Sequence, residues 1–411
     1  MQTVEQRQAA DARLAPFGGR SARLFATIVA LCALAFVGVV IAVSFILTSK
    51  PDTLAMSIDF RVFWAAGKLA MAGDPLAVLD LAKLSAAHAT NPDAHMPWVY
   101  PPGYLVMVTP LGAMSFSVAF TVWTILSLIL IAWAVRPFVA GILPLWILMI
   151  AAPAYFPSLL LGQNSLLWMA GLLGALAALR AERWVLAGIL IGSLTLKPQL
   201  GIMVPVALLA IGAWRTIFAA MATTALLAVL PTLIYGLEYW PLLKAGLIDH
   251  SASMVFSLGD LLLMISPLSA LTFIGVDPAL ALKVQWVIVA ATAVAVFALW
   301  RSDRVGFDAK AAGLLSAILL SAPYLWYYEG ALLAAIALFM LRSGVLQARP
   351  AHLLVLGALW IGAGLQVLNV FAKVVDQRWL GAAIIPPLVL LSLALCLRQM
   401  SAPRNLTQDT A

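Results

Sequence analysis

One carboxylate stands out in the only long polar segment of an otherwise apolar chain. Asp59 lies between Ser49 and Trp98 and directly precedes the amphipathic sequence Phe60–Trp64. A carboxylate within hydrogen-bond reach of a hydroxyl can take its proton as that oxygen attacks, and partial burial would raise the pKa of Asp59 toward a useful value. The sequence therefore presents Asp59 as a candidate general base. A plainer role is also open, because aspartate is favoured at the N-cap of a helix.

Lys197 is a second candidate, because no other ionisable residue lies between Trp184 and Trp214. Charges at membrane depth are costly, so such a residue is functional by default. Pro198 follows it and would break the helix, which leaves backbone groups open beside the ammonium. We expect Lys197 to bind a phosphate or another part of a substrate. The alternative is a lysine at a helix end whose ammonium reaches the interface.

Several further polar residues have two interpretations each. Arg61 lies two residues beyond Asp59; it could pair with that carboxylate or bind a phosphate, or it could extend to the interface. Gln163 and Asn164 begin an apolar segment, where amides can bind hydroxyl groups of a substrate or cap the helix. Asp74 stands between a glycine and a proline, and we assign it to a turn.

The remaining candidates are two tyrosines, a glutamate and a histidine. The segment 324–329 holds four aromatic rings and one acid at the end of an apolar run. We count Tyr327 and Glu329 from this segment, with Tyr100 from an earlier one, among the candidate binding residues. An aromatic belt at the membrane interface is the ordinary alternative. His250 lies in a segment that we expect to be external, where it could meet substrate.

Other features argue against several classes of protein. No His, Cys or carboxylate cluster has the spacing of a metal site, so we expect neither a metal nor a cofactor; His88 and His95 are expected to be solvated. Cys32 and Cys396 lie singly in apolar runs, without the spacing of a redox motif. The net charge of +7 is spread over short loops, which indicates membrane topology rather than nucleic-acid binding.

The elements that must position these residues are themselves apolar. The chain is 64% hydrophobic and 10% charged, whereas soluble domains have about 25% charged residues. A membrane-spanning helix needs about 20 apolar residues, so the chain has room for roughly ten to thirteen spans. We predict a single all-α, polytopic membrane domain over residues 1–411.

Basic residues predict the orientation of this domain. The first apolar run, 24–47, reads as an uncleaved span and follows four arginines, Arg7, Arg13, Arg20 and Arg23. By the positive-inside rule, residues 1–23 are cytoplasmic, and residues 49–98 form an external loop that carries the candidate base. The polar end of the chain, 399–411, is expected to be a cytoplasmic tail. In the external loop we expect short interfacial helices over 60–72 and 76–89.

The remaining apolar segments do not fit a simple count of spans. They are 99–114, 116–135, 138–160, 163–180, 184–196, 199–235, 256–275, 280–300, 311–341, 352–371 and 379–397. Counting from the two ends places the middle of the chain on opposite sides, so one segment is not a full span. The candidates are 99–114, which is short, and 184–214, which Lys197 and Pro198 interrupt. Broken helices at membrane depth are tolerated where they line an enclosed cavity, so we expect a site there.

The order of several short motifs resembles a known family. The motifs are Ser57–Gly67, Gly73–Pro75, Trp98–Pro102, Leu161–Asn164, Leu196–Gln199 and Ser321–Tyr324. This series resembles glycosyltransferase family 87 of the GT-C superfamily, over most of the chain. The resemblance implies a metal-independent, inverting transfer, commonly of mannose from a polyprenyl-phosphate carrier, on the extracytoplasmic face.

The expected function is therefore a hexosyltransferase of the cell's inner (plasma) membrane. Its donor would be a polyprenyl-phosphate sugar, its acceptor a lipid or glycan, and its base Asp59. A transporter or flippase of a lipid-linked or small polar substrate is the alternative; only one helix break is obvious, and we find no internal repeat of the kind that transporters often show. A purely structural membrane subunit would not require Asp59 and Lys197 at their positions.

Overall fold

The computed structural model describes residues 4–47, 58–88, 96–256, 263–362, 364 and 380–401. These residues form helices, with no β-structure beyond an isolated antiparallel bridge between Met264 and Trp326. The α-helices are α1 (Val4–Ala12), α2 (Arg20–Leu47), α3 (Ile58–Met71), α4 (Leu81–His88), α5 (Pro102–Val108), α6 (Phe116–Val135), α7 (Leu143–Ile150), α8 (Phe156–Leu161), α9 (Ser165–Arg180), α10 (Trp184–Ser193), α11 (Met203–Ala210), α12 (Trp214–Tyr235), α13 (Tyr239–Phe256), α15 (Pro267–Phe273), α16 (Pro278–Arg301), α17 (Phe307–Ser321), α18 (Leu332–Ser343), α19 (Pro350–Ile361) and α21 (Leu380–Arg398). The predicted all-α class is confirmed.

Six stretches of the described residues are long and apolar enough to cross a membrane. They are Arg20–Ile46, Phe116–Phe138, Leu143–Leu161, Trp214–Tyr235, Pro278–Arg301 and Gly381–Arg398. Shorter apolar helices cover Ser165–Arg180, Trp184–Leu196 and Pro350–Ile361. The protein is thus a polytopic membrane protein, as expected. The count of ten to thirteen spans stays a prediction, because parts of two apolar segments, 257–262 and 365–379, lie outside the described residues.

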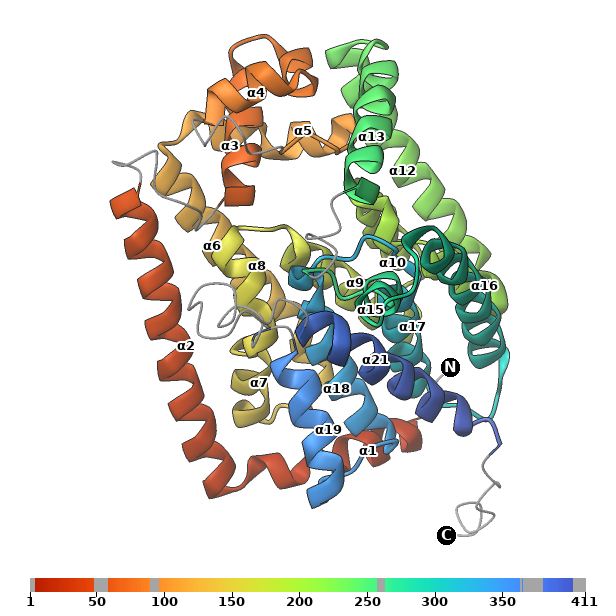
Figure 1. Ribbon diagram of the computed structural model, residues 1–411. Coiled ribbons are helices and arrows are strands. Elements are labelled where there is room, and N and C mark those ends of the chain that lie inside the picture. The colour runs from red at the N-terminus through yellow and green to blue at the C-terminus, as the bar shows by residue number, and fades with distance from the viewer. Residues whose placement is uncertain are drawn as a thin grey trace.

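The first polar loop folds into short helices at one end of the molecule. Figure 1 shows α3, α4 and α5 close to α13 at this end, whereas α1 lies at the opposite end. Helix α3 confirms the helix expected over 60–72. The single helix expected over 76–89 is wrong: a 3₁₀ segment, η2 (Pro75–Leu79), precedes α4. The chain breaks there because the side chain of Asp80 accepts hydrogen bonds from the backbone N–H groups of Ala82 and Lys83, which starts a new helix.

Two glycines hold α3 against the next part of the chain. Gly67 on α3 faces Gly112 in the 3₁₀ segment η3 (Thr109–Ala113). A Cβ atom on Gly112 would lie 2.4 Å from the backbone carbonyl carbon of Gly67, which is closer than any real contact. The two backbones therefore touch because neither residue has a side chain. The segment 99–114 is used in this packing as α5 and η3, and neither piece is long enough to cross a membrane.

The segment 184–214 returns to the side from which it starts. Thr216 at the start of α12 donates a hydrogen bond to the carbonyl of Trp184 at the start of α10 (3.0 Å). Farther along, a Cβ atom on Gly192 would meet Thr223, so α10 and α12 run parallel and begin at the same end. Helix α11 must then bring the chain back. Helices α10 and α11 thus form a re-entrant hairpin with Lys197 at its tip, so neither of the two segments that the span count had questioned, 99–114 and 184–214, is a single full span.

A buried charge cluster marks the end of the molecule opposite α3. Arg342 at the end of α18 is fully buried, and its guanidinium donates hydrogen bonds to Asp308 (3.2 Å), to Asp11 (2.9 Å) and to the carbonyl of Phe138 (2.7 Å). Arg180 at the end of α9 lies 3.9 Å from the same Asp308. We call these four side chains, Asp11, Arg180, Asp308 and Arg342, the Arg342 cluster. It fixes the N-terminal helix α1 beside the ends of α9 and α18.

The Arg342 cluster also shows which helix ends lie together. The last residues of α9 and α18 and the first turn of α17 all meet there. The other ends of these helices therefore lie deeper in the molecule, toward α3. Three connections lie at those deeper ends: the residues before α9, the tip of the α10–α11 hairpin, and η8 (Tyr327–Ala331) between α17 and α18. Each carries polar side chains that the sequence singled out.

Candidate active site

Asp59 is held in place by a tight contact between α3 and the end of α8. Gly162 ends α8 in the left-handed conformation (φ +71°), and a Cβ atom there would lie 2.4 Å from the Cβ of Phe60. Only glycine fits such a position. The turn delivers Gln163 directly to α3, where its side-chain amide donates a hydrogen bond of 3.0 Å to a carboxylate oxygen of Asp59.

A chain of polar contacts continues from Asp59 into the interior. The amide oxygen of Gln163 accepts a hydrogen bond from the backbone N–H of Asn164 (3.1 Å). The side-chain oxygen of Asn164 accepts one from the ammonium of Lys197 (2.9 Å), and Lys197 forms an ion pair with Glu329. The structure thus brings together five of the residues singled out from the sequence, which lie on four separate segments.

For three of these residues the sequence had left an alternative open, namely a helix cap for Gln163 and Asn164 and an ammonium at the interface for Lys197. The structure shows neither. Asn164 precedes α9 but makes no side-chain capping hydrogen bond, and Gln163 makes its contacts to Asp59 and Asn164. Lys197 is 5% exposed, so its ammonium does not reach the interface. Because buried charges are costly unless they are paired, the ion pair with Glu329 offsets the cost of burying the Lys197 ammonium.

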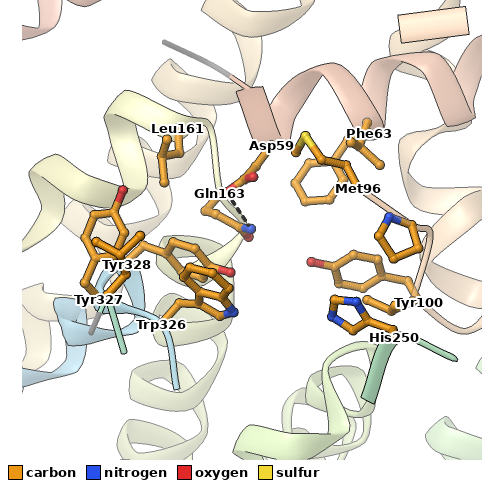
Figure 2. A pocket seen from close by; sticks show the side chains of 14 residues that line it. Asp59, Phe63, Met96, Tyr100, Leu161, Gln163, His250, Trp326, Tyr327 and Tyr328 are labelled. Carbon is orange, nitrogen blue, oxygen red and sulfur yellow. Dashed lines mark hydrogen bonds between the residues drawn. The ribbon is translucent and has the colours of Figure 1, made fainter. Parts of the chain in front are cut away.

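Two adjacent cavities open on either side of this polar chain. The smaller, of about 300 Å³, is lined by Asp59 and Gln163. The larger, of about 720 Å³, is lined by Lys197 and Glu329. They share five lining residues, Val99, Tyr100, His250, Trp326 and Tyr328. Figure 2 shows the smaller cavity, with Asp59 above, Tyr100 and His250 on one side, and Trp326, Tyr327 and Tyr328 on the other.

The aromatic walls are fixed by contacts between distant parts of the chain. Trp98 donates a hydrogen bond to the hydroxyl of Tyr239 on α13 (2.6 Å), and this hydroxyl donates to the carbonyl of Tyr100 (3.0 Å). The ring of Tyr100 meets that of Phe63 on α3 edge to face, with centroids 5.5 Å apart. These links hold the Tyr100 segment between α3 and α13.

Backbone pairing fixes the opposite wall. The N–H of Ile265 donates to the carbonyl of Leu325 (2.7 Å), and that of Tyr327 donates to the carbonyl of Leu263 (3.3 Å). The ring of Tyr328 then lies with its centroid 5.3 Å from the ammonium of Lys197. Residues of the aromatic run 324–329 therefore line the cavities.

The environment of Asp59 suits proton transfer near neutral pH. Burial raises the pKa of Asp59 from 3.8 to about 6, and the negative charge of Glu329 acts in the same direction. The hydrogen bond from Gln163 and the positive charge of Lys197 oppose this rise. A carboxyl with a pKa close to working pH is ionised often enough to accept a proton and basic enough to hold it. Burial, together with the charges of Asp59 and Glu329, also raises the pKa of Tyr100, so its hydroxyl stays a hydrogen-bond donor.

Other singled-out residues lie away from the cavities. The guanidinium of Arg61 lies over the ring of Phe116, 4.6 Å from its centroid, and Arg61 lines neither cavity. Asp74 belongs to the expected turn and pairs with Lys83 at the surface (3.4 Å). His88, expected to be solvated, is instead fully buried as the last residue of α4. His95 lies outside the described residues.

Sequence reasoning missed several residues that shape the site. Tyr239 and Phe63 are ordinary aromatic residues outside the candidate motifs' polar positions, and only the packing of distant segments reveals their roles. Gly162 could have been noticed, because a glycine directly before two adjacent amides is a signal for a turn that aims them. In the part of the chain that the structure describes, no three His, Cys, Asp or Glu side chains gather as a metal site would need.

One comparison with known proteins gives a match. A model of glycosyltransferase family 87 matches residues 98–323, more than half of the chain. The chain belongs to glycosyltransferase family 87. No curated protein and no solved structure matches it. The matched range includes Tyr100, Gln163, Asn164, Lys197 and His250. Asp59, Tyr327 and Glu329 lie outside it, and the structure alone joins them to the matched residues.

Membership of family 87 identifies the protein as a membrane glycosyltransferase, which acts on a sugar donor and an acceptor. The paired cavities offer room for two such substrates. The aromatic residues that line both cavities are suited to the apolar face of a sugar, and Asp59 lines only the smaller cavity whereas Lys197 lines only the larger.

Proposed function

We propose that the protein transfers a hexose, with mannose as the first sugar to test, from a polyprenyl-phosphate donor to a hydroxyl group of a lipid or glycan acceptor. The transfer inverts the anomeric centre, needs no metal or cofactor, and takes place on the extracytoplasmic face of the inner (plasma) membrane. The observation that carries this proposal is the polar chain from Asp59 to Lys197, which joins a candidate base in one cavity to the cation that lines the other.

The smaller cavity suits the acceptor. Asp59 lines it with a pKa raised to about 6, so the carboxylate can accept the proton of an incoming hydroxyl. Gln163 donates to the carboxylate oxygen and fixes the orientation of the group. The new bond forms between the acceptor oxygen and the anomeric carbon while the proton passes to Asp59.

The larger cavity suits the lipid-linked donor. Lys197 lines it, together with apolar residues of α12 and α13 such as Leu227, Leu243 and Leu247. An ammonium can hold the phosphate, and the apolar wall can hold the first isoprene units of the carrier. As the sugar leaves, the bonding electrons stay on the phosphate oxygen, whose growing negative charge Lys197 stabilises.

Inversion follows from this division of roles. Asp59 lines only the smaller cavity and Lys197 only the larger, and the two cavities are adjacent because five residues line both. A sugar held at those shared residues would be attacked from the side of Asp59 and would leave its phosphate on the side of Lys197. Attack opposite to the leaving group inverts the anomeric centre in a single displacement.

The positive-inside rule supports the extracytoplasmic side. Four arginines precede α2 or lie at its start, at the end of the molecule that holds the Arg342 cluster. Asp59 lies beyond the other end of this first apolar helix. If the arginine-rich end is cytoplasmic, the cavities open toward the opposite face.

Transfer by the purified, reconstituted protein tests the proposal. We expect labelled mannose to pass from a polyprenyl-phosphate donor to a lipid or glycan acceptor, in the presence or absence of EDTA. Asp59→Asn should lower kcat by at least 100-fold, because general-base catalysis contributes roughly 10²–10⁴-fold. Equal rates for wild type and Asp59→Asn would rule out Asp59 as the base. If neither protein transfers any hexose tried, the proposed function is ruled out.

A further inference from the structure

The cation of the larger cavity is already paired. Lys197 and Glu329 form an ion pair with side chains 6% and 5% exposed, and Asn164 accepts a further hydrogen bond from the ammonium. Among the described residues that line the two cavities, Lys197 is the only lysine or arginine. A phosphate that enters the larger cavity therefore meets one strong cation, which a carboxylate of the protein occupies.

Glu329 and a substrate phosphate would compete for the same ammonium. Carboxylate and phosphate oxygens both accept charge-assisted hydrogen bonds from lysine. Glu329 also repels a phosphate near Lys197, since both are negative. Donor binding must thus displace the carboxylate of Glu329 from Lys197 or share the ammonium with it.

The reaction changes the strength of this competition. The donor is a phosphodiester with one negative charge. Transfer joins the acceptor oxygen to the anomeric carbon, breaks the bond from that carbon to the phosphate oxygen and passes the acceptor proton to Asp59. The lipid product is a phosphate monoester that carries about −1.5 to −2 charges near neutral pH. On charge alone, the product would bind Lys197 more tightly than the donor does, and slow product release limits many enzymes.

We propose that Glu329 is a positioning residue that acts through Lys197 and drives the lipid phosphate out of the site after sugar transfer. This inference rests on the proposed function. Returning to its ion pair, the carboxylate replaces the product phosphate at Lys197 and repels it. The Lys197–Glu329 ion pair also weakens binding of the donor, but by a smaller factor than binding of the product, because the donor carries less negative charge.

The surroundings of Glu329 allow this exchange. Glu329 lies in the 3₁₀ segment η8 between α17 and α18 and is followed by Gly330. It lines the larger cavity, so a short rotation of its side chain moves the carboxylate away from Lys197 into open space. Lys197 keeps its hydrogen bond to Asn164 and its contact with the Tyr328 ring when Glu329 moves. The cation stays in place for the phosphate.

Binding of a polyprenyl phosphate to the intact protein in nanodiscs tests the inference without turnover. Glu329→Gln keeps the shape of the side chain and removes its charge. We expect its Kd for polyprenyl phosphate to fall about tenfold, as the loss of one close repulsive charge predicts. In the transfer assay, the KM for the donor should fall less than this Kd, and kcat should fall because release of the product becomes slower.

Glu238→Gln is the matched control, because Glu238 is an exposed acid outside both cavities and its substitution changes the net charge equally. It should leave Kd unchanged. Glu329→Asp, one methylene shorter, should lower Kd by a smaller factor, and it serves as the test if Glu329→Gln does not fold. An unchanged or raised Kd in a folded Glu329 variant would overturn the inference.

The two proposals fail in different ways. If the wild-type protein transfers the hexose but the Glu329 variants bind polyprenyl phosphate no more tightly than wild type, the proposed function holds and the role of Glu329 is ruled out. A wild-type protein that transfers no hexose from any lipid-phosphate donor removes the function, whatever Glu329 does. A protein that does not bind polyprenyl phosphate at all removes both.

Discussion

At the scale of single residues, the proposed chemistry depends on Asp59, a carboxyl that holds its proton more tightly than an ordinary aspartate does. Burial is the main cause, and the smaller cavity lets the carboxyl meet water and substrate. The same burial has a cost. Because the folded-state pKa of Asp59 is raised, its contribution to stability is complete below the ordinary pKa of 3.8 and is lost as pH rises through about 6. Asp59→Asn should therefore not destabilise the protein at pH 7.

The pH dependence of transfer is a direct test of this carboxyl. We expect kcat/KM to be flat above pH 7 and to fall about tenfold per pH unit well below pH 6, because protonated Asp59 cannot accept a proton. The rate profile should be recorded together with thermal unfolding at each pH, so that unfolding of the protein is distinguished from protonation of Asp59. An acid limb centred near pH 4 would show that the environment does not shift this group.

The sequence revealed individual site residues better than it revealed their partners. Lys197 was visible because a charge in a long apolar run needs a reason. Its ion pair with Glu329 could not be predicted, since it depends on which ends of α10 and α17 lie at the same depth. Arg61 shows the opposite error: proximity to Asp59 in the sequence suggested a shared role, but the helix turns its guanidinium onto Phe116.

At the scale of elements, the turn between α8 and α9 places Gln163 against Asp59, the proposed base. Gly162→Ala adds a Cβ atom at positive φ and within 2.4 Å of Phe60, so either the turn or α3 must shift. We expect a loss of at least about 2 kcal/mol in stability, from strain and overpacking together, and a marked drop in kcat as Gln163 moves away from Asp59. Thermal unfolding and transfer rates measure the two effects.

Gly73→Ala provides the matched control for Gly162→Ala. Gly73 has a similar positive φ (+86°), but no atom lies within 4 Å of the position its Cβ would take. Its substitution carries backbone strain alone, about 1 kcal/mol, and should leave kcat unchanged. If both variants lose activity equally, the close approach of the turn to α3 has no special role.

The sequence predicted which segments are helical, but it did not predict which helices cross the membrane. Apolar content identified α10 and α11, but whether they cross the membrane depends on the parallel packing of α10 against α12, which Gly188 and Gly192 permit. Composition carries no information on that direction. The interruption by Lys197 and Pro198 was the trace of the re-entrant hairpin in the sequence.

At the scale of the whole molecule, the Arg342 cluster joins helices far apart in the chain. Removing one member of a buried ion pair leaves an uncompensated charge and costs about 3–5 kcal/mol. We therefore expect Arg342→Met to lower the thermal unfolding midpoint strongly, although the cluster lies at the other end of the molecule from the cavities. Arg349→Met, which removes an exposed arginine shortly after α18, should change the midpoint little. Similar midpoints for the two variants would contradict a structural role for the cluster.

The length of α9 has a consequence for how the donor arrives. Its 16 residues span the distance from the Arg342 cluster to Asn164, a rise of about 24 Å at 1.5 Å per residue. The hydrocarbon core of a bilayer is about 30 Å thick. If the Arg342 cluster lies at the cytoplasmic boundary of the hydrocarbon core and α9 runs along the membrane normal, Asn164 and its neighbour Lys197 lie a few ångströms below the outer headgroups. Under the proposed function, a carrier already in the outer leaflet would then reach Lys197 by lateral diffusion, and this protein would not need to flip the loaded carrier.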